Sequence, residues 1–306
     1  MIDWYASNTT LIQNCMIAIL LALSVQVVMR IGVLSLAGIG FYGLSEYLTA
    51  NLVIRDVVPA EVAILASLVV CGIGAFVLSL FLGRVRGLYL AMVTLAFVLI
   101  LNVVAINGGK WTGGANGLFG VPFAVTTAHI VVVCLIGILV VWATERGAIG
   151  RACEALRTDE LLATSMGIEV RKYHRANLVL SGLLGGAAGG LNVLNLGAVG
   201  PFDAGFGLAV TTLTMVIVGG RRSWLGAVIG AVLITWLPTV LSFLEGEMRN
   251  IASGALVIVM ATLVPDGLLG LLTSQIRRLR AAVRRPSGRS TTKEVDDDTQ
   301  LVSADR

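Results

Sequence analysis

The chain has 306 residues, of which 57% are hydrophobic and only 13% charged, and its formal net charge is +4. A soluble domain carries about 25% charged residues, and a soluble protein this apolar lacks the polar surface to cover itself. The composition therefore excludes an ordinary soluble protein and predicts an all-α, polytopic transmembrane helical bundle.

Nine apolar runs are long enough, or nearly so, to cross a bilayer as helices, which takes about 20 residues. The N-terminus has no basic region ahead of its first run, so we expect a retained span and no cleaved signal peptide. The seventh run is short and has glycine-rich neighbours, so it is a span, a half-helix or a re-entrant segment. The predicted number of spans is therefore about nine, with a range of eight to ten. The runs are 11–29, 33–54, 61–82, 87–106, 123–144, 176–196, 205–220, 224–243 and 251–271.

Lysine and arginine indicate the orientation of these spans. If the C-terminus is cytoplasmic, 19 of the 22 basic residues lie inside and only Arg55, Lys110 and Arg249 lie outside. This distribution follows the positive-inside rule, so we expect the N-terminus outside and the C-terminus in the cytoplasm. The basic pI of about 9.1 reflects this bias and does not indicate nucleic-acid binding.

The last part of the chain differs from the rest in composition. Residues 277–289 are rich in arginine and directly follow the last run, where basic side chains meet anionic lipid headgroups. From Ser290 onward the sequence is polar and has no apolar periodicity. We therefore expect a membrane domain over 1–272 and a cytoplasmic tail over 273–306 that is basic, then acidic, and disordered.

Glu46 lies near the middle of the second run, where an ionisable side chain costs several kcal/mol unless it is partnered or faces water. It is predicted to face either the translocation path or a partner subunit. The alternative is a kinked helix that places Glu46 near the outer interface.

Residues 107–120 contain six glycines on the predicted outer face. They form either a loop that folds back to shape a pore entrance or an ordinary flexible loop.

The segment 145–175 is the most informative polar part of the sequence. Ile149, Cys153, Leu156, Ala163 and Met166 follow a helical spacing and predict one short amphipathic helix on the cytoplasmic side, closed by a left-handed glycine. Such a helix either rests on the membrane surface or docks into another protein. The small apolar residues and mixed charges favour docking.

Residues 155–191, ALRTDELLATSMGIEVRKYHRANLVLSGLLGGAAGGL, resemble the coupling segment of branched-chain amino-acid ABC transporter permeases of the LivM-like group. Five further segments resemble the same family in the expected order. They are 34–47, 84–97, 112–122, 218–233 and 264–272. The positions that match the coupling segment are Arg157, Asp159, Glu160, Ala163, Gly167, Ile168, Ser181 and Gly189.

The resemblance implies a permease subunit of an ATP-driven importer in a bacterial plasma (inner) membrane. It implies as partners a second, LivH-like permease, two cytoplasmic ATPase subunits, an extracytoplasmic solute-binding protein and membrane lipid. The chain itself contains no GxxxxGK[ST] loop to hydrolyse ATP. The residues implied to couple to the ATPase are Arg157, Asp159, Glu160, Ala163 and Gly167.

The sequence also departs from this family. LivM-like chains often have Gly-Ala where this chain has Ser45-Glu46, and they carry a charged pair where it has Leu99 and Asn102. Branched-chain amino acids therefore remain the default solute, and other small polar solutes stay open. The candidate residues of the translocation path are Glu46, Asn102, Gly113, Gly114, Asn116 and Gly117.

Two other function classes were compared with the importer. A self-sufficient secondary transporter often has several intramembrane carboxylates, but Glu46 is thin support for one. A membrane-embedded enzyme needs clustered catalytic groups. The sequence has neither a nucleophile–base spacing nor a metal motif, so we expect no catalytic residues, no metal and no cofactor.

Overall fold

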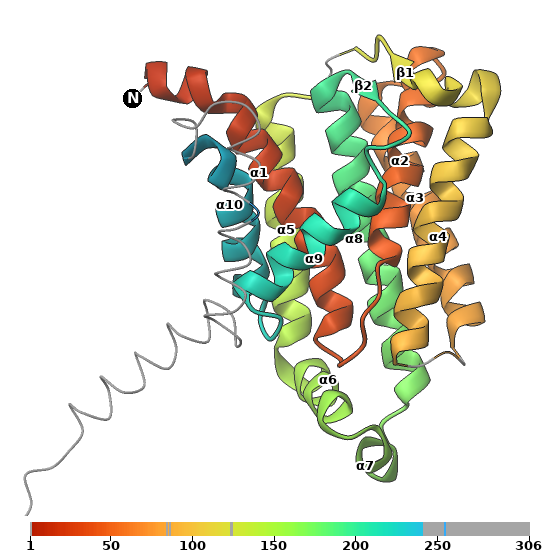
Figure 1. The fold of residues 1–306 in the computed structure, drawn as a ribbon. Helices are drawn as coiled ribbons and strands as arrows, with labels where there is room; N and C mark the ends of the chain where they lie inside the picture. Colours follow the sequence, from red (N-terminus) through yellow and green to blue (C-terminus); the bar gives the residue numbers. More distant parts are fainter. Residues whose placement is uncertain (1, 84, 86, 123–124, 241–253, 255–306) are drawn as a thin grey trace, which may run out of the picture. The chain divides into compact units, whose positions relative to one another are not determined.

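The computed structural model describes residues 2–83, 85, 87–122, 125–240 and 254, and there the predicted all-α fold is confirmed (Figure 1). The predicted span 251–271, the end of the run 224–243 and the tail 273–306 lie outside the described residues. The described helices are α1 (Ile2–Met29), α2 (Ala37–Ile54), α3 (Ala60–Leu82), α4 (Leu88–Asn107), α5 (Thr127–Glu145), α6 (Gly147–Thr158), α7 (Glu160–Ser165), α8 (Val170–Leu196), α9 (Phe206–Gly219) and α10 (Trp224–Val240).

Five of these helices are long and apolar enough to cross a membrane, namely residues Thr9–Met29 of α1 together with α3, α4, α5 and α8. The 14-residue α9 rises about 21 Å, less than the roughly 30 Å of a hydrocarbon core, so it does not cross a bilayer unaided. The helix α2 is not among the five, because Glu46 and Asn51 lower its hydropathy.

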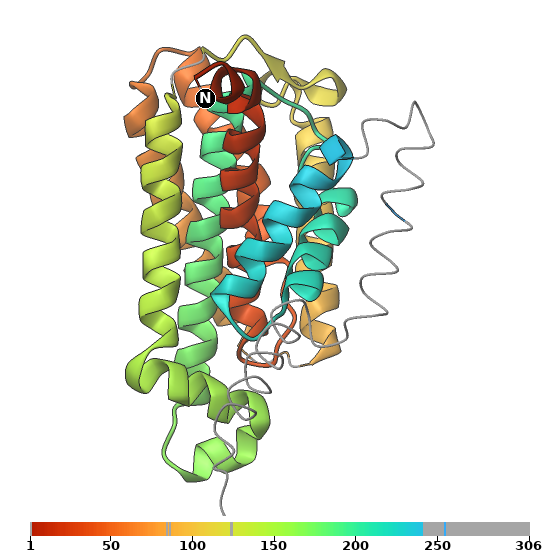
Figure 2. The same ribbon diagram turned by 90° about the vertical axis from the view of Figure 1, so that its left-hand side faces the viewer.

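The helix α8 forms the centre of the bundle and packs against α1, α2 and α3 (Figures 1 and 2). In its most apolar window 78% of the residues are buried, compared with 22% in α3 and in α5. Its contact with α2 is close: Gly185 faces the backbone of Gly38 and Gly189 faces the backbone of Tyr42, without room for a Cβ atom. Small residues permit this approach between membrane helices.

The outer faces of α3, α4 and α5 carry long apolar side chains. Leu65 on α3 and Leu135 on α5 are 64% and 58% exposed, for example. Such a surface would promote aggregation in water, whereas in a bilayer it contacts lipid tails. The described helices are therefore those of a multi-pass membrane protein.

Candidate functional site

The segment 145–175 forms two short helices, so the prediction of a single amphipathic helix was wrong. The break falls at Asp159, whose backbone is extended and whose Oδ1 accepts hydrogen bonds from the amides of Leu161 (2.8 Å) and Leu162 (3.2 Å). An aspartate in this position caps the start of a new helix, here α7. The predicted apolar stripe is divided accordingly: Cys153, Leu156 and Ala163 are buried, whereas Ile149 and Met166 are 46% and 70% exposed.

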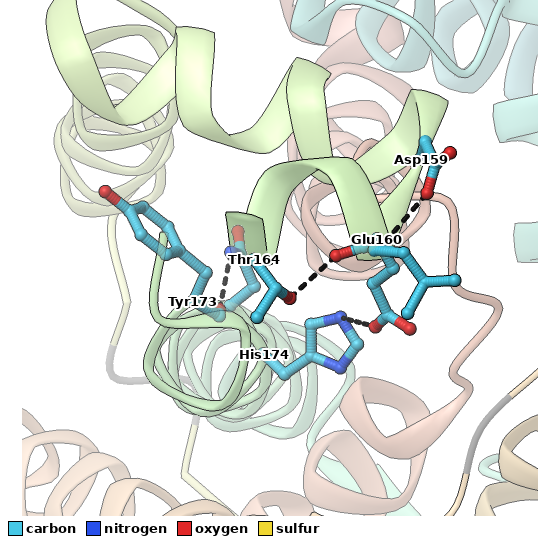
Figure 3. Close-up of polar contacts among 7 residues, drawn as sticks. Asp159, Glu160, Thr164, Tyr173 and His174 are labelled. Atoms are coloured by element: carbon cyan, nitrogen blue, oxygen red, sulfur yellow. Dashed lines mark hydrogen bonds and ion pairs between the residues drawn. The ribbon is translucent and has the colours of Figure 1, made fainter. Parts of the chain in front are cut away.

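The helix α7 is fixed to the start of α8. Ala163 is buried, and Glu160 Oε1 lies 3.5 Å from Nε2 of His174 on α8 (Figure 3). Gly167 closes α7 in the left-handed conformation (φ +81°), and the amide of Ile168 bonds to the carbonyl of Ala163. The predicted closing role of Gly167 is therefore confirmed, and Asp159, Glu160, Ala163 and Gly167 together shape α7 and its attachment.

The exposed surface of α7 and of its C-cap residue includes three large apolar side chains, of which only Met166 belonged to the predicted apolar stripe. Leu161, Leu162 and Met166 are exposed by 80%, 57% and 70%, and α7 lies beyond the ends of the spans (Figure 1). Soluble surfaces rarely expose several large apolar side chains together. The Leu161-Leu162 pair, two residues after the capping Asp159, was the available sequence signal for this surface.

The helix α6 rests on the ends of the spans. Cys153 and Leu156 are buried, and the backbone of Arg157 packs against Gly32 in the turn after α1. Burial raises the pKa of the Cys153 thiol, and the nearby Arg30 partly offsets this effect. Arg157 thus lies where α6 meets the α1–α2 turn.

At the opposite end of the bundle the glycine-rich residues 107–120 form an ordered structure (Figure 1). Two 3₁₀ turns, η1 (Gly109–Trp111) and η2 (Gly114–Asn116), lead into strand β1 (Leu118–Phe119), which pairs antiparallel with β2 (Ala198–Val199). The loop therefore has regular local structure and folds back onto the connection that follows α8.

The glycines of this loop have a conformational reason. Gly113, Gly114 and Gly117 all have positive φ, and Gly117 also lies against the carbonyl of Val199. A side chain at Gly117 would collide with β2. Asn116 is exposed beside them.

Asn102, a predicted path residue, lines a pocket. Its Nδ2 donates to the carbonyl of Pro201 at 2.6 Å, which joins α4 to the connection between α8 and α9. The pocket of about 110 Å³ lies between α2 and α4, and Tyr47 and Thr112 line it as well. It is mainly apolar.

Glu46 occupies a separate position between α2 and α8. Its side chain is fully buried, and its Oε1 accepts a hydrogen bond of 2.8 Å from Nδ2 of Asn192. Glu46 is therefore partnered inside the bundle and does not face lipid in this structure. Asn192, its partner, was not predicted, because nothing local in the sequence connects residues that are 146 positions apart.

A family model described as the permease component of branched-chain amino acid transport systems matches residues 9–261. The chain is 28% identical to the high-affinity branched-chain amino acid permease protein LivM of Escherichia coli K12 over 304 residues, covering 88% of this chain and 71% of LivM. It is 27% identical to LivH of Salmonella typhimurium over 168 residues, 54% of each chain. It is also 27% identical to the D-allose permease protein AlsC of E. coli K12 over 241 residues, 72% of this chain and 71% of AlsC.

No solved structure matches the chain. The family model covers most of the sequence, and the LivM match covers 88% of it. The chain therefore belongs to the family of permease components of branched-chain amino acid transport systems.

Proposed function

We propose that this chain is the membrane-spanning permease subunit of an ATP-driven importer, and that α6 and α7 seat in a separate cytoplasmic ATPase. The observation that carries the proposal is the surface of α7, where Leu161, Leu162 and Met166 are exposed beyond the span ends. A short helix with an exposed apolar surface is suited to docking into a groove of another protein. The buried side of the same segment is fixed to α8 through Ala163 and the Glu160–His174 contact.

The orientation follows from the same proposal. The ATPase binds from the cytoplasm, so α6, α7 and the basic residues around them lie inside, the N-terminus lies outside and the β1–β2 end faces the solute-binding protein. The strong excess of Lys and Arg on this side supports that orientation. The likeness to both LivM and LivH supports pairing with a second permease.

The proposed solutes are branched-chain amino acids or similar small polar molecules, in line with the names of the LivM and LivH relatives. The candidate path begins at the outer glycine loop and the pocket beside Asn102. Glu46 lies behind this pocket, between α2 and α8. It can touch solute only after these two helices separate. Replacing Glu46 with Gln keeps an oxygen for Asn192, so we expect normal assembly and reduced solute uptake; unchanged uptake removes Glu46 from the path.

Copurification from detergent-solubilised membranes tests the ATPase contact. A tagged chain, expressed with the products of its neighbouring genes, is expected to retain two ATPase subunits. Replacing Leu161 and Met166 together with Glu should reduce their recovery at least about tenfold, because burying each large apolar side chain is worth about 1.5–3 kcal/mol.

Lys172→Glu is the matched control, because Lys172 is exposed on the same side of the protein but lies outside α7. Full ATPase recovery with the double variant would contradict the assignment of α7. Uptake by the purified chain alone, driven by an ion gradient without ATP, would support a secondary transporter in place of an importer subunit.

A further inference from the structure

Polar side chains from several helices meet beneath α6. Arg30, directly after α1, is 7% exposed and donates through Nη1 to Thr144 Oγ1 on α5 at 2.9 Å. Its Nε and Nη2 donate to Oδ1 of Asn177 on α8, at 3.2 and 2.8 Å. Through one guanidinium, α1 is thus connected to both α5 and α8.

The coupling helix α6 is connected to the same group. Asn177 Nδ2 lies 3.9 Å from Sγ of Cys153 on α6 and donates to the carbonyl of Tyr173 at 2.8 Å. The turn that contains Arg30 continues to Gly32, which packs on Arg157 at the end of α6. A displacement of α6 therefore acts on Arg30 by two routes: through Asn177, and through the turn after α1 that contains Arg30 and Gly32.

Glu145 extends the network to α10. Its Oε1 accepts from Nε2 of Gln26 on α1 at 3.0 Å and from the backbone amide of Trp224, the first residue of α10, at 2.7 Å. The opposite charges of Glu145 and Arg30 attract each other. The ends of α1, α5, α8 and α10 thus share one set of polar contacts.

The buried apolar cluster that α6 joins does not extend to α5 or α10 within the described residues. The buried apolar cluster that contains Cys153 draws its other members from α1 to α4, the turn after α1, and α8. Within the described residues none of its members belongs to α5 or α10. The chain itself joins α6 to α5, since α6 begins two residues after Glu145. For α10 the described connection to this group is polar and runs through Glu145.

We propose that Arg30 is a positioning residue that transmits displacement of α6 to the spans, so that ATP hydrolysis is coupled to solute movement. This inference rests on the proposed importer function and concerns the path inside the chain after the ATPase has bound. The planar guanidinium has five donors and holds Thr144 and Asn177 at once. A lysine ammonium keeps the charge but lacks that fork, so it cannot hold both in the same geometry.

The test uses the complete transporter, with the partner permease, the ATPases and the binding protein, in proteoliposomes. Uptake of radiolabelled leucine and ATP hydrolysis are measured together. Arg30→Gln and Arg30→Lys are expected to retain the ATPase subunits and ATP hydrolysis. The number of ATP molecules consumed per leucine should rise roughly tenfold. A tenfold change corresponds to a loss of about 1.4 kcal/mol of coupling free energy.

Two further variants separate this role from simple folding. Asn177→Leu removes both the oxygen that accepts from Arg30 and the Nδ2 beside Cys153, so it should raise the ratio of ATP to leucine as Arg30→Gln does. Arg146→Gln is the matched control, because Arg146 is an exposed arginine at the end of α5 that stacks on Trp142. Its ratio should stay normal.

A normal ratio in both Arg30 variants overturns the inference. If Arg30→Gln fails to assemble, Arg30→Lys and Thr144→Val decide, and unchanged ratios in these two overturn it equally. If the unaltered chain recovers no ATPase or shows no ATP-dependent uptake, the importer proposal itself has failed, which is a different result.

Discussion

The two ends of the bundle both carry short segments that do not span the membrane, but they are held in different ways. Beneath α6 and α7 the attachment uses side chains, with Arg30, Asn177 and the Glu160–His174 contact joining separate helices. At the opposite end the loop after α4 is held by backbone pairing between β1 and β2 and by glycines with positive φ.

The difference matters because the two kinds of contact respond differently to change. A backbone ladder with glycine at fixed positions tolerates almost no substitution there, and it keeps one shape. Side-chain contacts can shift between rotamers while the helices stay intact. We infer that the β1–β2 end is a rigid cap and that the α6–α7 end is the adjustable one.

The largest effect is expected at the rigid end. Gly117 has φ 78° and ψ −172°, a region that only glycine adopts readily, and a Cβ atom there would meet the carbonyl of Val199. Gly117→Val should therefore destabilise the protein by about 3 kcal/mol or more, measured as unfolding in detergent. Gly120→Ala is the control: Gly120 also has positive φ, but no neighbour lies within 4 Å of its Cβ position. Its cost should be only about 1 kcal/mol, and equal losses in the two variants would argue against the rigid cap.

A smaller effect is expected at the adjustable end. Asp159→Ala removes the cap that starts α7, which costs about 1 kcal/mol of local helix stability. We expect little change in global unfolding and a clear loss of ATPase recovery, because α7 frays. Thr158→Ala is the neighbouring control, since Thr158 only bonds back to the carbonyl of Glu154. Loss of global stability in Asp159→Ala would show that α7 belongs to the rigid core.

The smallest effect concerns reactivity without loss of structure. All four cysteines are buried, and burial raises the pKa of the Cys153 thiol. A raised pKa lowers the thiolate fraction at a given pH, so alkylation should be slow near pH 7.5 and accelerate as pH rises towards that pKa.

An Ile149→Cys variant provides the comparison on the same helix, where Ile149 is 46% exposed. It should react with a maleimide at least about tenfold faster than the native chain at pH 7.5. Similar rates would mean that α6 separates from the span ends often enough to expose Cys153.

Hydropathy located the main helices well, because a bilayer requires long apolar runs regardless of their partners. It also indicated that the run 205–220 is short, which α9 confirms, but it could not reveal that α9 packs against α10, since that packing depends on tertiary contacts. The capping geometry of Asp159 explains why the one predicted helix became two.

The functional contacts were harder to predict for a physical reason. From the sequence, Arg30 is one of many basic residues on the inner side, and its partner Thr144 lies 114 positions away. The Glu46–Asn192 bond joins residues that are further apart still. Hydropathy and local spacing carry no information about which buried polar groups contact each other in the folded chain.

The continuity of α8 has a mechanical consequence. From His174 beside α7 to Asn192 beside Glu46, one uninterrupted helix rises about 27 Å. A helix of this length acts as a lever: a tilt of about 5° about one of these residues moves the other by about 2 Å. We infer that a tilt of this size about the α7 end, with α7 still attached, is large enough to break the hydrogen bond between Glu46 and Asn192.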